Sequence, residues 1–196
     1  CVAWSSTYAA RTIVEAASTG QTGNNTAYSP AYVYNQIGLE GCQGAYIQNA
    51  MELMTKKGVV TYNDFPYTDQ DCSRQPNSVL DNKAAQNKML GFTRLTDGES
   101  VQGISVRAIK EHLAKDAPVV IGMMVGGSFM QSMMGKEMWA PTNEDRSQMG
   151  FGGQCQHHLP AVFLRAASAE QSALLEFPQA AAEIALIGPD AGNNDG

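Results

Sequence analysis

Two features that mark large classes of proteins are scarce in this sequence. It has no block of Lys and Arg, and its 196 residues carry 13 basic against 19 acidic side chains, a formal net charge of −6. Because nucleic-acid-binding proteins need a basic surface opposite the phosphates, this balance argues against a nucleic-acid partner. The longest apolar runs are far shorter than the roughly 20 residues of a membrane-spanning helix. No membrane span is therefore predicted.

Paired cysteines are missing as well. The four cysteines are Cys1, Cys42, Cys72 and Cys155, and no two of them form a C-x-x-C pair. Without that spacing a zinc site is not expected, and no other metal or cofactor is predicted. Four cysteines could form two disulfides in three ways, and one disulfide with two thiols fits equally well. Their number therefore leaves the redox compartment open.

The first half of the sequence has the apolar spacing of helices. Apolar residues recur at helical intervals over residues 1–19, and Gly20 follows where a helix would end. A Ser-Pro pair introduces a second predicted helix at 31–37, and a third begins at Ile47 and closes at 56–58. The apolar stripe of the first helix consists of Trp4, Tyr8, Ala9, Ile13, Ala16 and Ala17.

The second half adds a strand to this helical pattern. A helix is predicted near 106–115, with Ile109 and Leu113 on its buried face. The continuous apolar run at 119–125, bounded by turn residues, predicts a buried strand. Helices first and strands later favour an α+β fold over alternating β-α-β units.

Cys1 is a candidate nucleophile. Only the thiolate of a cysteine attacks, and the unpaired N–H groups of a helix's first turn lower the pKa of a thiol there. Cys1 stands at such a place, ahead of an aromatic at Trp4. A small, buried core residue is an equally good interpretation of this local pattern. A cut precursor and a fragment of a longer chain would both begin in this way.

Several segments resemble, in the same order, the papain-like cysteine peptidases of a bacterial branch. The matching segments are Cys1-Val2-Ala3-Trp4-Ser5 beside the family's Cys-Trp-Ala-Phe-Ser, Ser29-Pro30-Ala31-Tyr32-Val33-Tyr34-Asn35 beside Ser-Pro-x-x-Leu-Tyr-Asn, Gly41-Cys42-Gln43-Gly44-Ala45-Tyr46 beside Gly-Cys-Asn-Gly-Gly-Tyr, and Asp64-Phe65-Pro66-Tyr67 beside the stretch ending in Tyr-Pro-Tyr. Residues 109–125 resemble the helix and strand of the family's second lobe. Each match alone is weak, but their order is specific over about residues 1–153.

The resemblance implies a two-lobed α+β fold, with the peptide substrate between the lobes. One peptidase domain would span 1–165, truncated at its N-terminal side, with a helical lobe at about 1–95 and a β-rich lobe at about 96–165. Residues 166–196 would be an Ala-rich acidic tail. In this reading Cys1 is the nucleophile, and a peptide or protein is the substrate.

The resemblance also implies a substrate-binding role for the loop after Gly41. The backbones of Gly44 and Ala45 would bind the substrate strand. Cys42 and Cys72 fall where the family has disulfide cysteines, so a bridge between them is implied. An extracytoplasmic or secreted location is expected rather than the cytoplasm.

The general base departs from the family pattern. Gly152-Gly153 resembles the lead into the family's Gly-Gly-His, but Gln154 occupies the position of the histidine. An amide cannot take up a proton at neutral pH as imidazole does. His157 and His158 are the nearby candidates. On an extended strand His158 would share the face of Gln154 but lie about 13 Å further along.

Two further assignments of histidine are considered. His112, on the charged face of its helix, is predicted to be a solvated surface residue. Cys155, His157 and His158 lie within four residues of one another and cannot easily all reach one tetrahedral metal.

The resemblance ends after Gly153. The family's Asn-Ser-Trp segment, whose asparagine orients the imidazole, has no counterpart, since the tryptophans are Trp4 and Trp139. The stretch that follows has no Lys or Arg from position 166 onward. An error in the reading frame, true divergence and a domain edge each explain such a change of composition.

The sequence therefore predicts a cysteine-type endopeptidase that forms a thiolate acyl-enzyme, with Cys1, His157 and His158 as catalytic residues. One alternative is a catalytically impaired member that binds peptides or proteins. Another is an N-terminal nucleophile hydrolase that uses the α-amine of Cys1 as base. Such hydrolases start on a strand, whereas Cys1 opens a helical pattern.

Overall fold

The computed structural model describes residues 1–21, 26–69, 71–95, 105–115, 117–122, 127–132, 142–144, 161–164 and 183–187. Their elements are η1 (Trp4–Arg11), α1 (Thr12–Thr19), α2 (Pro30–Ile37), η2 (Glu40–Cys42), α3 (Ile47–Lys56), α4 (Ser78–Ala84), β1 (Phe92–Arg94), α5 (Val106–Leu113), β2 (Val119–Gly122), α6 (Gly127–Ser132), β3 (Ala161–Leu164) and β4 (Glu183–Ile187). The predicted α+β class is confirmed. Within these residues no helix combines the length and the apolar character needed to cross a membrane.

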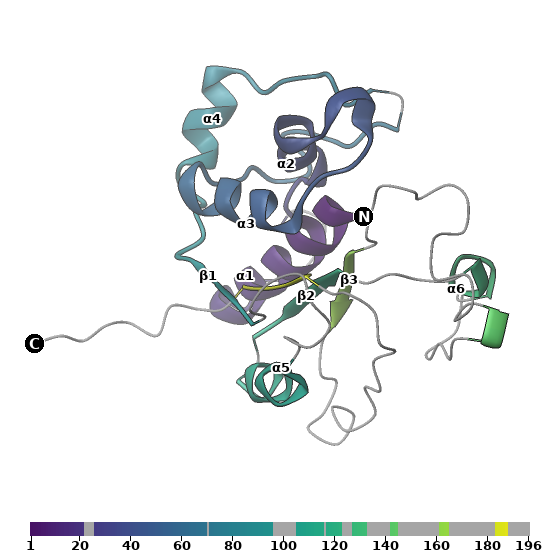
Figure 1. Ribbon diagram of the computed structural model, residues 1–196. Coiled ribbons are helices and arrows are strands. Elements are labelled where there is room, and N and C mark those ends of the chain that lie inside the picture. The colour runs from purple at the N-terminus through teal and green to yellow at the C-terminus, as the bar shows by residue number, and fades with distance from the viewer. Residues whose placement is uncertain are drawn as a thin grey trace, which may run out of the picture.

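The helices and the sheet form layers. The sheet has the strand order β1-β4-β2-β3, and all three neighbouring pairs are antiparallel. α2, α3 and α4 gather on one side of the sheet, while α5 lies on the other side against β2 (Figure 1). The core between the layers contains fully buried side chains from both, such as Met51 of α3 and Val120 of β2.

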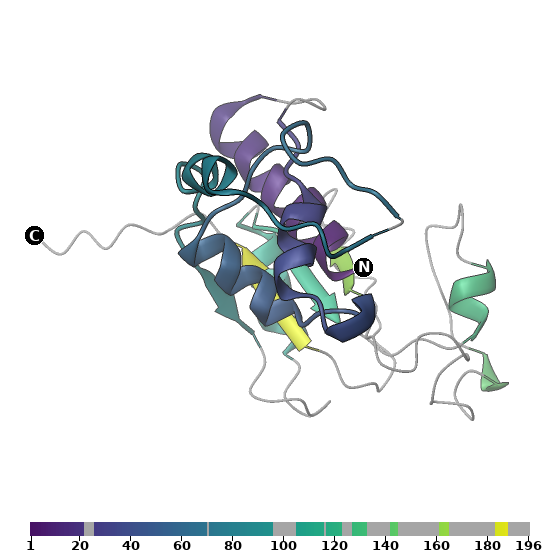
Figure 2. The same ribbon diagram turned by 90° about the horizontal axis from the view of Figure 1, so that it is seen from above.

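The first helix runs between the α2–α4 helices and the sheet (Figure 1), and Figure 2 shows it from above. It is helical from Val2 onward, passes from the π-type turns of η1 into α1, and ends at Gly20. Gly20 has φ +70° and donates its N–H to the carbonyl of Ala16 at 2.9 Å, a typical left-handed end. η1 contacts α2 and α3 on one side and β2 and β3 on the other. The predicted helix over 1–19 is confirmed.

The other predicted helices are confirmed too, with the expected caps and faces. The Ser29 hydroxyl accepts the Tyr32 N–H at 3.0 Å and so caps α2. α5 buries Ile109 and Leu113. The predicted strand at 119–125 is β2 up to Gly122, and its remainder lies outside the described residues. α3 buries Ile47, Ala50, Met51 and Met54.

Short elements with little local signal were not predicted. α4 begins after Asn77, whose side chain accepts the Leu80 N–H at 3.0 Å. β3 and β4 flank β2, so that Val120 stands opposite both Phe163 and Ala185. β4 comes from the segment predicted as a tail, and it lies between β1 and β2 in the sheet. The domain division at 165 remains a prediction.

A buried charge anchors the central helix. Arg11 is only 6% exposed, forms an ion pair with Glu15 at 2.8 Å and stacks on the Tyr28 ring at 4.5 Å. A guanidinium N–H of Arg11 also donates to the Tyr28 hydroxyl at 3.3 Å. Burial raises the pKa of Tyr28 to about 12, although the nearby Arg11 charge acts in the opposite direction. The guanidinium therefore ties η1 to the chain that leads into α2.

Candidate active site

Cys1 lies at the exposed start of the central helix. Its carbonyl accepts two hydrogen bonds from Ser5, one from the N–H and one from the hydroxyl, both at 3.0 Å. The Ser6 hydroxyl donates to the Val2 carbonyl at 2.7 Å. These bonds hold the first turn from Cys1 onward, so Cys1 stands where a helix presents its N-terminal N–H groups. A helical start also disfavours the N-terminal nucleophile alternative.

Small side chains let this helix pack on both sides. Its buried residues are Val2, Ala3, Ser5, Ser6, Thr7, Ala10 and Arg11. Trp4 belongs to the apolar stripe, yet it is 39% exposed. Trp4 instead packs against other aromatic rings at the surface, with centroids 4.8 Å from Tyr8 and 5.4 Å from Tyr67. Aromatic stacking replaces burial there.

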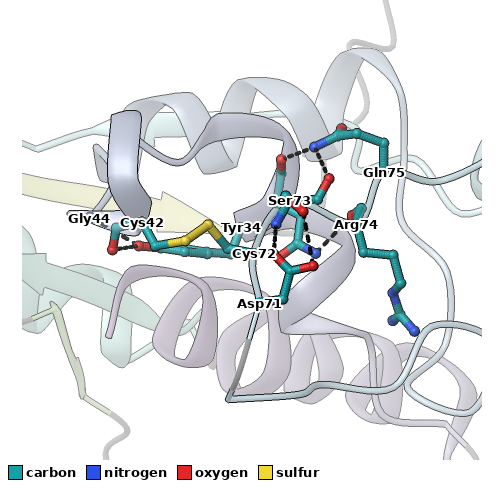
Figure 3. Close-up of a disulfide and its surroundings, with 9 residues drawn as sticks. Tyr34, Cys42, Gly44, Asp71, Cys72, Ser73, Arg74 and Gln75 are labelled. Atoms are coloured by element: carbon teal, nitrogen blue, oxygen red, sulfur yellow. Dashed lines mark hydrogen bonds between the residues drawn. A yellow bond between two sulfur atoms is a disulfide. The ribbon is translucent and has the colours of Figure 1, made fainter.

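The loop predicted to bind the substrate is held by internal hydrogen bonds (Figure 3). The Tyr34 hydroxyl donates to the Cys42 carbonyl at 2.7 Å and accepts the Gly44 N–H at 2.9 Å. The Gly44 carbonyl accepts the Leu39 N–H at 2.8 Å. Both backbone groups of Gly44 are thus engaged inside the loop. Among the described residues, none pairs with the N–H of Ala45, which is half-buried.

A disulfide joins this loop to a second one. Cys42 and Cys72 are bridged, with their Cα atoms 6.0 Å apart, which confirms the pairing implied by the resemblance. The second loop is tied to α2 by side-chain amides. Asn35 donates to the Arg74 carbonyl at 2.8 Å, and Gln75 donates to the Asn35 carbonyl at 2.5 Å (Figure 3). Tyr34 and Asn35 are part of the matched motif, but no sequence pattern indicates these contacts.

The predicted general bases stay a prediction. Gln154, His157 and His158 lie outside the described residues. β3 begins three residues after His158 and contacts η1. Both Figure 1 and Figure 2 show the N-terminal end of the chain beside β3.

His112 belongs to a different region. It lies on α5, across the sheet from η1 (Figure 1). It is half-buried, not the fully solvated residue predicted from the sequence. Burial, and after it the charge of Lys115, lowers the pKa of His112.

The described residues contain no cluster of three His, Cys, Asp or Glu side chains that could hold a metal ion. Cys155, the other residue weighed as a metal ligand beside the two histidines, also lies outside them. The described residues do include an exposed thiol and helix N–H groups at the start of the first helix, and a loop in which the Ala45 N–H pairs with none of them. This set suits attack on a carbonyl and binding of an extended peptide.

Comparison with protein families gives one match. The family model for papain family cysteine proteases matches residues 1–150. Comparison with curated protein sequences finds no match.

Comparison with solved structures gives likenesses at low sequence identity. Xylellain, a cysteine protease from Xylella fastidiosa, is similar with a TM-score of 0.60 and 17% identity over 97% of this chain and 79% of that one. A cysteine protease from Carica candamarcensis matches 66% of this chain and 56% of its own with 20% identity and a TM-score of 0.44. Digestive procathepsin L 3 of Tenebrio molitor larval midgut matches 63% of this chain and 38% of its own, with 17% identity and a TM-score of 0.46.

Proposed function

The chain belongs to the papain family of cysteine proteases, and from this premise we propose that it is a cysteine endopeptidase with Cys1 as its nucleophile. Its papain-like α+β fold accords with that membership. The observation that carries the proposal is the position of Cys1. The residue is exposed at the start of a helix that packs between the helical layer and the sheet.

The proposed chemistry is acyl transfer to sulfur. An imidazole takes the thiol proton, and the thiolate sulfur forms a bond with the carbonyl carbon of the peptide. The tetrahedral intermediate collapses with loss of the amine, which leaves with a proton from the imidazolium. Water then attacks the thioester and releases the acid and the thiol. Backbone N–H groups at the helix start would stabilise the oxyanion.

We assign the base to the pair His157 and His158. The family position is occupied by Gln154, and the third histidine, His112, lies on α5 beyond the sheet. β3 begins three positions after His158, and a step of three residues spans at most about 10 Å. Because β3 contacts η1, that reach supports an imidazole near the helix start.

A thiol-directed peptidyl epoxide tests the nucleophile. At neutral pH we expect it to modify Cys1 much faster than a buffer thiol of ordinary pKa, since only a thiolate reacts quickly. The label is located by peptide mapping, with Cys1→Ser as the negative control and Cys155→Ser as the matched thiol control. Labelling that survives in Cys1→Ser, or that is lost in Cys155→Ser, would overturn the assignment.

A second candidate function is peptide binding with little turnover. Gln154 supports it, because an amide supplies neither the base nor the acid of the reaction. A fluorogenic peptide separates the two candidates. Measurable release of the fluorophore that Cys1→Ser abolishes favours the peptidase. Tight binding of the same peptide without release of the fluorophore favours the binding domain.

The disulfide supports a proposal on location. Disulfides form and persist in oxidising compartments. We therefore place the protein outside the cytoplasm or in the secreted fraction. Alkylation of intact cells before lysis, followed by mapping of Cys42 and Cys72, tests this. Recovery of both cysteines as alkylated thiols would contradict it.

A further inference from the structure

We propose that Tyr34 is a positioning residue that fixes the backbone of Ala45 for substrate binding. This inference rests on the proposed function, because it concerns how the peptide is held before Cys1 attacks. Tyr34 reaches the loop with a single hydroxyl that donates to the Cys42 carbonyl at 2.7 Å and accepts the Gly44 N–H at 2.9 Å. One group thus holds both sides of the turn (Figure 3).

The turn needs such a restraint because its backbone is unfavourable. Gly41 has φ +71°, and Cys42, which has a side chain, has φ +59°. The left-handed region is costly for a residue with a Cβ, so it persists only where the surroundings enforce it. Here the surroundings are the hydrogen bonds of Tyr34 and the disulfide to Cys72.

Gly44 and Ala45 differ in how their backbone groups are used. Gly44 uses its N–H for Tyr34 and its carbonyl for the Leu39 N–H at 2.8 Å. The N–H of Ala45 has no such use among the described residues. Gly44 is therefore the anchor, and Ala45 is the next residue along the chain, whose amide remains for a peptide strand. Backbone pairing of this kind binds extended peptides without regard to their side chains.

The tyrosine is itself held in place. Its ring lies against Gly38, where an added Cβ would stand 3.1 Å from the Tyr34 carbonyl and 3.6 Å from the ring. Its neighbour Asn35 is bonded to the loop that carries Cys72. The Tyr34 hydroxyl is therefore held in position by α2, whereas Tyr67 is an exposed tyrosine.

The test separates recognition of the peptide from reactivity of the thiol. Cys1 is labelled in a Cys155→Ser background with a peptidyl epoxide and, separately, with iodoacetamide, which needs no backbone pairing. For Tyr34→Phe we expect the second-order rate with the epoxide to fall about tenfold through a weaker KI, the effect of one or two modest hydrogen bonds. The iodoacetamide rate should not change. Tyr67→Phe, the matched control, should leave both rates unchanged.

Two other results would overturn the proposal in distinguishable ways. If the unchanged protein shows no preference for the epoxide over iodoacetamide, the proposed function fails, and the role of Tyr34 with it. If the preference is present and Tyr34→Phe retains it, or loses both rates equally, only the role of Tyr34 fails.

Hydrogen exchange of the unmodified protein provides a check that needs no variant. The Gly44 amide should be protected from exchange in the protein alone, since Tyr34 already accepts its proton. The Ala45 amide should become protected only when a peptide aldehyde is bound. Rapid exchange at Gly44, or no change at Ala45 on binding, would refute the assignment even if Tyr34→Phe did not fold.

Discussion

The two sides of the candidate site are built by different means. On the helical side, Cys1 and the Gly44–Ala45 loop are fixed by caps, a disulfide and side-chain hydrogen bonds between residues of the first 75 positions. On the sheet side, β3 and β4 reach β2 from more than 35 positions away in the chain, through backbone pairing. The helical side keeps the family's motifs in order, and the sheet side loses them after Gly153.

This contrast shows where a change of sequence is tolerated. Backbone pairing in a sheet asks little of the side chains, so a strand can form on a segment whose catalytic pattern is gone. A cap, a disulfide or a hydroxyl clamp requires particular residues. The fold can therefore persist where the chemistry does not.

The largest expected effect concerns the position at which the family has its catalytic histidine and this chain has Gln154. Gln154→His should raise kcat/KM on a fluorogenic peptide by up to about 10² to 10⁴, because it puts an imidazole at the family's own position, which His157 and His158 serve only from displaced positions. Gln156→His adds the same imidazole two residues away and should leave the rate as it is. The double change of His157 and His158 to Ala should remove the activity of the unaltered chain.

A different result would show that the helical side and the sheet side do not differ in this respect. If the unaltered chain turns over like other peptidases and survives the loss of His157 and His158, both the impairment by Gln154 and the assigned base are wrong.

The second effect concerns the cross-link on the helical side. Replacing Cys42 and Cys72 together by Ser should lower the free energy of unfolding by about 3 to 4 kcal/mol, the loss of chain entropy expected for a bridge across 30 residues. Urea unfolding measures it. Cys155→Ser, the control at a cysteine outside this bridge, should cost far less. Equal midpoints for the two variants would mean that the bridge does not stabilise the helical side.

The third effect is steric and local. A Cβ on Gly58 would stand 1.9 Å from the Ala84 carbonyl oxygen, and Gly58 has φ +93°. We expect Gly58→Ala to cost about 2 to 3 kcal/mol, because strain and overlap add. Gly20, with φ +70° and open space around it, isolates the strain, so Gly20→Ala should cost only about 1 kcal/mol. Similar costs for both would contradict the predicted overlap with α4.

The same contrast explains what could be predicted from the sequence. The first helix, α2 and α3 carry local signals, such as the Ser29 cap and the apolar face through Met51, and these were identified. The disulfide followed from the resemblance. β3 and β4 have no such signal, because a strand of four or five residues depends on its partners.

Within the candidate site, the motifs predict residues but not the contacts between them. Cys1 and Ala45 were named from motifs. The hydroxyl of Tyr34 joins positions eight and ten residues further along the chain, which no spacing rule indicates. Trp4 belongs to the apolar stripe, yet the helix buries Ser6 and Thr7 and leaves the indole ring partly exposed.

The smallest expected effect compares the two sides as the pH falls. Burial alone would raise the pKa of Asp81, but hydrogen bonds from Lys57 and Tyr32 prevail and lower it. On the other side, burial and then Lys115 lower the pKa of His112. A carboxyl with a lowered pKa stabilises the fold above its unfolded value of about 3.9 and loses that contribution as the pH falls further. An imidazole with a lowered pKa resists protonation, so its cost begins as the pH falls through about 6.5.

The two losses should therefore occur in separate pH ranges. We expect urea midpoints to decline first below about pH 6.5 and again below about pH 4. His112→Gln should remove the first decline only. Asp81→Asn should lower the midpoint at pH 7 and flatten the second decline, whereas the exposed Asp69→Asn should change neither. Because α5 packs on the sheet and Asp81 lies on α4, a first decline that responds to Asp81→Asn would mean that the two sides do not respond independently to acid.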